Sequence, residues 1–311
     1  MEGREALALA TYAGYRAGAA LAEAVPNPLG SKIVALMART FALAPTRRRR
    51  MVRRHFRRVL GSGAPEQAIE AAVTGAFESY ARYWHEAFRL PSRPPAELLA
   101  SCEVEGLEHL DAALDAGRGV VLAVPHLGNW DIGGAWFVAR GYPMAAVVEH
   151  LEPARLFEWF VANRRAMGIE VVPLGHDATA QCLRLLARPG IVALLCDRDL
   201  SGAGLEIEFF GERTRLPAGP AVLALRSQAS LVTSACYFTP TGHRIVLRPP
   251  LPTERRGRLR EDAARLTQQL AVELEELVRA APRQWHLVQP NWPSDFALLE
   301  AMARERRGAR R

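Results

Sequence analysis

A histidine and an aspartate five residues apart could carry acid–base chemistry in this chain. His126 and Asp131 both lie in the segment PHLGNWD, residues 125–131. Imidazole titrates near neutral pH, so a histidine can take the proton of a hydroxyl group while that hydroxyl attacks a substrate. A carboxylate within reach of the other ring nitrogen would fix the tautomer and stabilise the imidazolium. The competing interpretation is a polar loop in which Asp131 only begins a helix.

The residues before His126 predict where this histidine lies. Residues 120–124 form a short apolar run rich in β-branched side chains, which is typical of a buried strand. Pro125 cannot donate to a sheet ladder, so we expect the strand to end there and a helix to follow over residues 131–140. His126 is then at the carboxyl end of a strand, where open α/β sheets form their ligand crevices.

Two other apolar runs, residues 144–149 and 191–196, are predicted strands that also end in charged side chains. An arginine-bearing helix is predicted between them over residues 156–167. Because the carboxyl ends of parallel strands meet at one edge of a sheet, these side chains are expected near His126. The charged candidates at this edge are Glu149, Arg164, Asp197, Arg198 and Asp199. Spacing does not choose between Asp131 and Asp197 as the carboxylate that orients His126.

Several common chemistries lack their motif. The chain has no G-x-S-x-G elbow for a serine nucleophile, no Walker loop and no dinucleotide-binding fingerprint. Zinc would need a second well-spaced histidine beside His126, so we predict no metal site. The four cysteines are scattered, with neither metal-ligand spacing nor a disulfide framework, which suits a reducing cytoplasm.

Composition and charge restrict the fold and the partners. With 311 residues, 49% of them hydrophobic and 23% charged, the chain can bury a sizeable core in one large α/β domain or two small ones. A net charge of +7 favours an anionic partner: a phospholipid surface, a nucleotide or a phosphorylated substrate. We predict no signal peptide, because Arg16 interrupts the first apolar run, and we find no stretch of about 18 apolar residues.

The N-terminal residues predict helices that suit a membrane surface. Helices over 5–24 and 32–43 are more hydrophobic than ordinary surface helices, so they either pack on each other or lie on a membrane. A third helix, 47–60, surrounds an apolar stripe with arginines and suits an anionic bilayer face. The stripe consists of Met51, Val52, Phe56, Val59 and Leu60. Nucleic acid is the rival partner, but no binding motif supports it, so we expect none.

The rest of the chain predicts an α/β domain. A helix over 66–90 carries an aromatic stripe that we interpret as core: Phe77, Tyr80, Tyr83, Trp84 and Phe88. After a proline-rich break at 91–95, strands and helices alternate, which predicts a mainly parallel mixed sheet covered by helices. We predict a single domain with a helical N-terminal portion (1–95), a catalytic core (96–293) and a tail (294–311) that is disordered from residue 304.

The residues around His126 resemble a known family. His126-Leu-Gly-Asn-Trp-Asp131 has the H-x-x-x-x-D motif of the glycerolipid acyltransferase superfamily. The fuller pattern resembles the branch that contains bacterial lipid A lauroyl acyltransferases and actinobacterial phosphatidylinositol mannoside acyltransferases. The matching segments, spread over roughly residues 50–293, are 79–84, 88–91, 197–200, 209–217, 219–220 and 285–290. In one departure, Asp197-Arg-Asp199 stands where the mannoside branch commonly has Glu-Arg-Asp, so the first acid is one methylene shorter.

This resemblance implies a glycerol-3-phosphate acyltransferase-like fold and a peripheral enzyme at the cytoplasmic face of the cell membrane. The implied reaction moves a fatty acyl chain, palmitoyl, from acyl-CoA to a mannose hydroxyl of a phosphatidylinositol mannoside. Acyl-CoA is then a co-substrate, and no cofactor is implied. The implied catalytic residues are His126 as general base, Asp131 and Asp197, and the implied substrate-binding residues are Glu149, Arg164, Arg198 and Asp199.

Two alternatives to this reading remain open. The same reaction could use another acceptor: a lysophospholipid, glycerol phosphate or a different glycolipid. The chain could instead bind membrane lipid without turnover. The intact pair of His126 and Asp131 argues against the second alternative, since a non-catalytic relative would be free to lose it.

Overall fold

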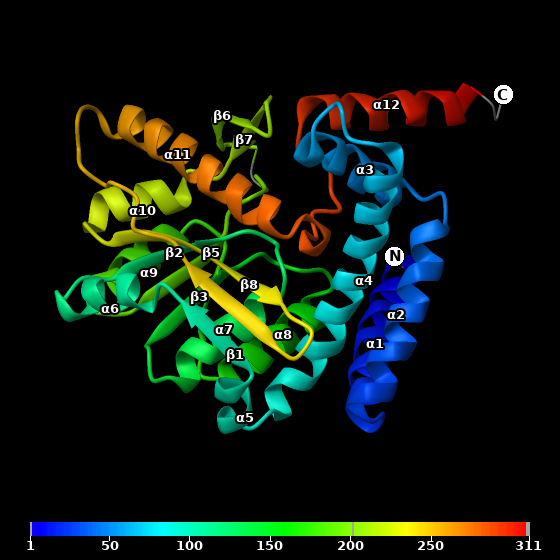
Figure 1. Cartoon of the computed structure of the whole chain (residues 1–311), viewed down its shortest axis with the longest axis horizontal. Helices are drawn as coiled ribbons and strands as arrows, with labels where there is room; N and C mark the ends of the chain where they lie inside the picture. The colour runs from blue at the N-terminus through cyan, green and yellow to red at the C-terminus, as the bar shows by residue number, and fades with distance from the viewer. Residues whose placement is uncertain (1, 201, 309–311) are drawn as a thin grey trace.

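A seven-stranded sheet forms the centre of the computed structural model, which describes residues 2–200 and 202–308 (Figure 1). The strand order is β1-β9-β8-β2-β5-β3-β4. β8 and β9 form an antiparallel hairpin, and all other neighbours in this sheet are parallel. The predicted mainly parallel mixed sheet is therefore confirmed. Its strands are β1 (Cys102–Glu105), β2 (Val120–Val124), β3 (Met144–Val148), β4 (Glu170–Pro173), β5 (Ile191–Leu195), β8 (Ser230–Phe238) and β9 (His243–Leu247).

Helices cover both faces of the sheet because alternate residues of its central strands are apolar on both sides. Along β2, Val120 and Leu122 join one buried cluster, whereas Val121 and Ala123 join the other. The first cluster includes side chains of α5 (Pro95–Ala100), α6 (Leu107–Asp115) and α7 (Trp130–Ala139). The second includes side chains of α9 (Ala178–Leu186), α10 (Gly219–Ser227) and α11 (Leu259–Ala280).

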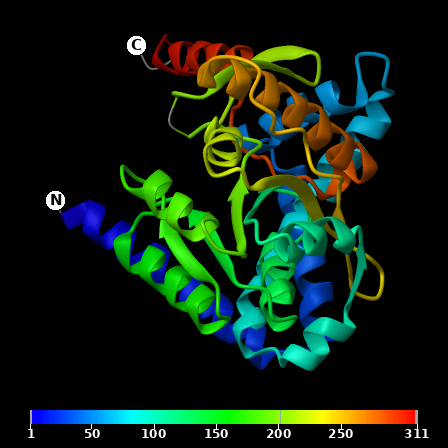
Figure 2. The same ribbon diagram turned by 90° about the vertical axis from the view of Figure 1, so that its left-hand side faces the viewer.

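The N-terminal helices form a group around the long helix α4 (Glu66–Arg89). α1 (Glu2–Ala24) and α2 (Asn27–Leu43) run beside α4, and α3 (Arg47–Leu60) packs against it near one end (Figure 1). α8 (Ala154–Ala166) lies beside α1 on the side turned to the viewer in Figure 2. Within residues 2–200 and 202–308, no helix is both long enough and apolar enough to cross a membrane.

The apolar stripe of α3 faces the protein interior, so the prediction that it faces a membrane is wrong. Met51, Val52, Phe56 and Val59 are all buried, and Leu60 packs against the same core. An amphipathic helix can bury its apolar face against protein as readily as against lipid, and here α4 and α11 supply that partner. Several arginines of α3 are paired with acids: Arg49 with Glu70, Arg53 with Glu66 and Glu70, and Arg57 with Glu66.

The C-terminal segment is also more ordered than predicted. Helix α12 (Pro293–Gly308) continues through residues 304–308, which corrects the predicted disorder there, while residues 309–311 lie outside the described part. The first turn of α12 is held by Asp295, which is fully buried and pairs with Arg54 and Arg58 of α3. Contacts between residues so far apart leave no local pattern in the sequence. The two-stranded hairpin of β6 (Leu205–Phe209) and β7 (Glu212–Leu216) lies apart from the main sheet.

Candidate active site

The loop between β2 and α7 places His126 at the carboxyl end of the central strand. β2 ends at Val124, as predicted from Pro125. Gly128 has a φ of +62°, and a Cβ there would lie 2.0 Å from the carbonyl oxygen of Cys236, so only glycine fits. The side chain of Asn129 accepts a hydrogen bond from the amide of Ile132 (3.1 Å) and thereby caps α7. The loop conformation is thus fixed by its own sequence and by β8.

His126 is paired with Asp197, which follows β5. The Nδ1–H of His126 donates to Asp197 Oδ1 (2.6 Å), and the amide of His126 donates to Oδ2 (3.0 Å). Asp197 is fully buried. Burial opposes its ionisation, but His126 and the Trp285 indole outweigh this effect and lower the pKa of Asp197 below its ordinary value. Asp197 therefore reaches His126 although it is one methylene shorter than a glutamate. It contacts Nδ1, and Nε2 lies on the other side of the imidazole ring.

Asp131 has different partners. It forms an ion pair with Arg164 of α8 (2.8 Å) and accepts a hydrogen bond from the hydroxyl of Tyr83 on α4 (2.7 Å). Burial, followed by the charge of Asp131, raises the pKa of Tyr83 well above its ordinary value, so this hydroxyl stays protonated and donates. Asp131 therefore links α4, α7 and α8 beside the histidine. The structure brings Asp197, and not Asp131, to the ring nitrogen of His126.

A cavity of about 710 Å³ opens over the carboxyl ends of β3 and β5, and the ring of His126 lines it. All the charged residues predicted for substrate binding line this cavity as well: Glu149, Arg164, Arg198 and Asp199. Glu149 and Arg198 form an ion pair in its wall (2.8 Å). Asp199 accepts a hydrogen bond from the amide of Gly204 (2.8 Å). The predicted convergence of these side chains at one edge of the sheet is therefore confirmed.

An apolar crevice of about 80 Å³ adjoins this cavity between α7 and the sheet. The two share several wall residues, among them Trp130 and Arg164. The interior of the crevice is formed mostly by aliphatic and aromatic side chains, among them Leu122, Phe137 and Met144. The cavity is thus polar where the charged residues lie and continues into an apolar recess next to His126.

Sequence reasoning missed several aromatic residues of the site. Tyr80, Tyr83 and Trp84 of α4, which we interpreted as core, line the cavity. The two tyrosines could have indicated this, because a buried phenol needs a polar partner and is therefore seldom a purely apolar core residue. His286 also lines the cavity, and it is hydrogen-bonded through Nε2 to the hydroxyl of Ser79 (2.8 Å). Burial lowers the pKa of His286 to about 3, so this ring is neutral at neutral pH.

The described residues, 2–200 and 202–308, contain no group of three or more His, Cys, Asp or Glu side chains that could hold a metal ion. The site instead offers one histidine–carboxylate pair, two ion pairs and an apolar recess. Such an arrangement can move a proton to and from a bound hydroxyl group beside an apolar chain.

Comparison with known proteins finds a family profile, several relatives and a solved structure that this chain resembles. The profile of the bacterial lipid A biosynthesis acyltransferases matches residues 4–294. The chain is 37% identical over 292 residues to a phosphatidylinositol mannoside acyltransferase from Mycolicibacterium smegmatis, covering 92% of this chain and 93% of the relative. It is 39% identical over 252 residues to the protein of that name from Mycobacterium tuberculosis, covering 79% and 78%. A solved 1-acyl-sn-glycerophosphate acyltransferase from Thermotoga maritima aligns with a TM-score of 0.38 at 13% identity, over 80% of this chain and 97% of that one.

Proposed function

The chain belongs to the bacterial lipid A biosynthesis acyltransferase family, and we propose that it transfers a fatty acyl group from acyl-CoA to a mannose hydroxyl of a phosphatidylinositol mannoside. The acceptor is taken from the name of the relatives at 37–39% identity, which align with most of this chain. One observation of the site supports the chemistry most directly. His126 lines the cavity while its Nδ1–H is held by a buried carboxylate, which is the arrangement of a general base.

In the proposed reaction, Nε2 of His126 takes the proton of the mannose hydroxyl as its oxygen attacks the thioester carbonyl. Asp197 keeps Nδ1 protonated and stabilises the imidazolium that forms. The tetrahedral intermediate then collapses, the carbon–sulfur bond breaks, and the proton passes from Nε2 to the leaving CoA thiolate. The products are the acylated mannoside and free CoA, and His126 returns to its neutral form.

The oxyanion of the tetrahedral intermediate needs hydrogen-bond donors. Trp130 and Asp131 are the first two residues of α7, and amides in the first turn of a helix have no acceptor within the helix. The positive end of the helix dipole lies at the same place. We therefore assign these two amides to the developing negative charge, four to five residues after His126.

The apolar crevice and the polar cavity suit the acyl chain and the polar groups of the substrates, respectively. The apolar crevice between α7 and the sheet would receive part of the acyl chain of the donor, since at about 80 Å³ it is too small for a whole palmitoyl chain. The polar end of the cavity, with Glu149, Arg164, Arg198 and Asp199, would bind the sugar and phosphate groups. The thioester would then lie where these two regions meet, next to the ring of His126.

We propose that α1 and α2 carry the enzyme on the cytoplasmic face of an anionic membrane. The exposed large apolar residues of these helices are Leu7, Leu9, Leu21, Leu29, Ile33, Leu36, Met37, Phe41 and Leu43. Those of α2 recur at helical spacing, and Lys32, Arg47, Arg48 and Arg50 are exposed nearby. Apolar side chains among cations suit the interface of an anionic bilayer.

The cavity lies close to this surface, which fits an acceptor that is anchored in a membrane. Tyr15 of α1 packs edge-on against Trp84 (5.3 Å between ring centroids) and Phe160 (5.8 Å). Both of these rings line the cavity. A headgroup at the membrane surface could therefore enter beside α1.

The proposed reaction can be tested with radiolabelled palmitoyl-CoA and a panel of acceptors. The panel contains a phosphatidylinositol mannoside, a lysophospholipid and glycerol 3-phosphate, and the products are separated. We expect label in the mannoside, released by mild base as an ester is. Label only in one of the other acceptors would replace the proposed acceptor, and no label in any of them would contradict acyl transfer from palmitoyl-CoA.

A further inference from the structure

Residues 284–292, which we call the strap, pass directly behind the candidate catalytic pair. The amide of Gly128 donates to the carbonyl of Gln284 (2.9 Å), and the amide of His286 donates to the carbonyl of His126 (2.7 Å). Between these two bonds, Leu127 and Trp285 form an isolated antiparallel bridge. The main chain of the strap therefore fixes the main chain that carries His126.

The strap also holds Asp197. The indole N–H of Trp285 donates to Oδ2 of Asp197 (2.8 Å), and the side-chain amide of Asn291 donates to the carbonyl of Asp197 (3.1 Å). Trp285 is only 2% exposed. With the His126 amide on Oδ2 as well, the second oxygen of the carboxylate, Oδ1, is directed to the ring of His126. Both members of the pair are thus positioned by the same segment.

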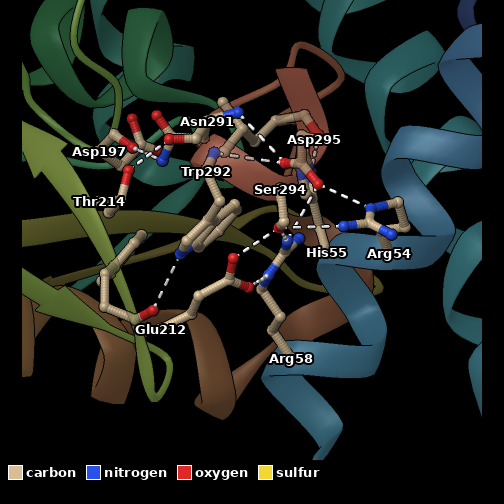
Figure 3. A network of polar contacts seen from close by, with 12 residues as sticks. Arg54, His55, Arg58, Asp197, Glu212, Thr214, Asn291, Trp292, Ser294 and Asp295 are labelled. Carbon is tan, nitrogen blue, oxygen red and sulfur yellow. Dashed lines mark hydrogen bonds and ion pairs between the residues drawn. The ribbon is translucent and has the colours of Figure 1, made fainter. Parts of the chain in front are cut away.

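The far end of the strap is anchored in the body of the protein (Figure 3). The amides of Asn291 and Trp292 donate to Oδ2 of Asp295 (3.3 and 3.4 Å). Asp295 in turn pairs with Arg54 and Arg58 of α3, as the dashed lines in Figure 3 show. The strap is therefore fixed at both ends, so Trp285 meets Asp197 in one defined orientation.

The Trp285 bond affects both the geometry and the proton affinity of the pair. A carboxylate without solvent can rotate unless donors fix it, and here the indole N–H supplies one such donor. A neutral donor also favours the more negative of two protonation states, which is the state with a neutral His126. Loss of the N–H should therefore raise the pKa of the pair and loosen the orientation of the ring.

We propose that Trp285 is a positioning residue, which sets the orientation and basicity of His126 through Asp197. This proposal rests on the proposed function, in which His126 is the base. Trp285 lies beneath the pair and acts through the carboxylate, so it contacts no reacting atom.

Most other titratable groups near the pair are neutral or have partners of their own. Burial lowers the pKa of His286 to about 3 and raises that of the Cys196 thiol well above its ordinary value. The charged groups in the surrounding walls are Asp131 with Arg164, Glu149 with Arg198, and Asp199 with the Gly204 amide, and His176 also lines the cavity. The indole N–H of Trp285 donates to Asp197 and to none of these groups.

The test compares two substitutions of the same kind. Trp285→Phe removes the N–H bonded to Asp197, whereas Trp136→Phe, in the middle of α7, removes a buried indole N–H that has no hydrogen-bond partner among residues 2–200 and 202–308. For Trp285→Phe we expect kcat to fall at least about tenfold, KM for both substrates to stay within about twofold, and the acid limb of the pH–rate profile to move up by about half a unit or more. Trp136→Phe should keep kcat within about twofold and leave that limb in place.

A second measurement does not depend on turnover. NMR titration of the resting protein gives the pKa of His126 directly, and we expect it to be higher in Trp285→Phe than in the wild type. If that variant does not fold, the wild-type Trp285 indole N–H resonance should still titrate together with His126. An unchanged His126 pKa in the folded variant, or an indole resonance insensitive to that titration, would overturn the proposal. An inactive wild type would instead count against the proposed function, and the NMR result would still decide the role of Trp285.

Discussion

At the residue scale, the two aspartates near His126 have different partners and different roles. Asp197 accepts the Nδ1–H of His126, whereas Asp131 balances Arg164 and receives the hydroxyl of Tyr83. A histidine held by a buried carboxylate has one tautomer, with Nε2 able to accept a proton. The proposed base is therefore defined by geometry as well as by its place in the motif.

Replacing the histidine tests the base. We expect His126→Ala to fold normally and to lower acyl transfer by at least about 10²-fold, since positioned bases contribute about 10²–10⁴-fold. His126 is 22% exposed, so its removal leaves no large void in the core. The rate is measured with labelled acyl-CoA and folding by circular dichroism. A folded variant with near wild-type turnover would show that His126 is not the base.

Comparing the two aspartates tests which of them orients the histidine. Asp197→Asn should lower kcat by about 10²–10⁴-fold, because the amide cannot stabilise the imidazolium and can favour the wrong tautomer. Asp131→Asn should lower activity less and mainly through KM, because its partner Arg164 lines the cavity. Steady-state kinetics of both folded variants measure this difference. Equal losses in kcat, or a larger loss for Asp131→Asn, would contradict the assignment.

At the scale of elements, the sequence predicted what depends on local pattern. β2 was expected at residues 120–124 and lies there, since Pro125 ends it, and α7 begins within one residue of its expected start. The partner of α3 could not be predicted. Its stripe around Phe56 has the spacing of a membrane-surface helix and of a packed helix alike, and only the position of α4 in space decides between them.

The same limit applied to the site. The strand ends predicted that Glu149 and Asp197 converge near His126, because parallel strands share an edge, and the structure has both there. Trp285 reaches the site from the strap, and Tyr83 reaches it from α4. Both residues are too far in sequence from their partners for a periodic pattern to predict these contacts. These contacts depend on how separate elements pack. The spacing of residues within one element gives no information about that packing.

The surface of α1 and α2 gives an element-scale prediction about membrane binding. Leu36→Asp with Phe41→Asp should weaken binding to anionic liposomes at least about tenfold, since both side chains are more than 60% exposed and each would bury apolar area in the lipid. Binding is measured by co-sedimentation, and turnover of a detergent-dispersed acceptor should be largely kept. The control is Val272→Asp; Val272 is 47% exposed and belongs to α11 rather than to α1 or α2.

Charge on this surface can be separated from apolar insertion. Replacing Arg47, Arg48 and Arg50 with Gln should weaken binding to anionic liposomes and reduce its sensitivity to salt, because only the electrostatic part is screened. Arg49 is left in place because it pairs with Glu70. Equal binding of the wild type to neutral and anionic liposomes, unaffected by salt, would show that these arginines serve another purpose.

At the scale of the whole molecule, one buried network joins the N-terminal helices, the C-terminal helix and the site. Asp295 of α12 pairs with Arg54 of α3 (Figure 3). In the adjoining strap, the side chain of Asn291 donates to the carbonyl of Asp197, and the carbonyl of Asn291 accepts a hydrogen bond from Thr214 of β7. Disturbing Asp295 should therefore be felt both in the stability of the fold and at the catalytic pair.

This network makes a prediction about stability and pH. Burial opposes ionisation of Asp295, but His55 and Arg54 outweigh it and hold its pKa well below the ordinary value of an aspartate. A carboxyl whose pKa is lowered by folding stabilises the protein fully above its unfolded pKa, which is about 3.9, and this stabilisation is lost as the pH falls toward the folded pKa. Asp295→Asn should therefore lower the free energy of unfolding at pH 7 by about 2–3 kcal/mol, somewhat less than for a fully buried pair because Arg54 is 32% exposed.

The difference in unfolding free energy between the wild type and Asp295→Asn should then narrow as the pH falls below about 4, because the unfolded wild-type chain takes up a proton there that the folded carboxylate does not. Urea unfolding at pH 7, 5 and 3.5 measures this difference in the free energy of unfolding. The control is Glu254→Gln, which should leave the free energy of unfolding unchanged because the Glu254 carboxylate is 79% exposed. A difference that stays constant across this range would mean that the asparagine disturbs packing and that the charge of Asp295 contributes nothing. The expected narrowing would show instead that the charge on Asp295 holds α3, the strap and α12 together.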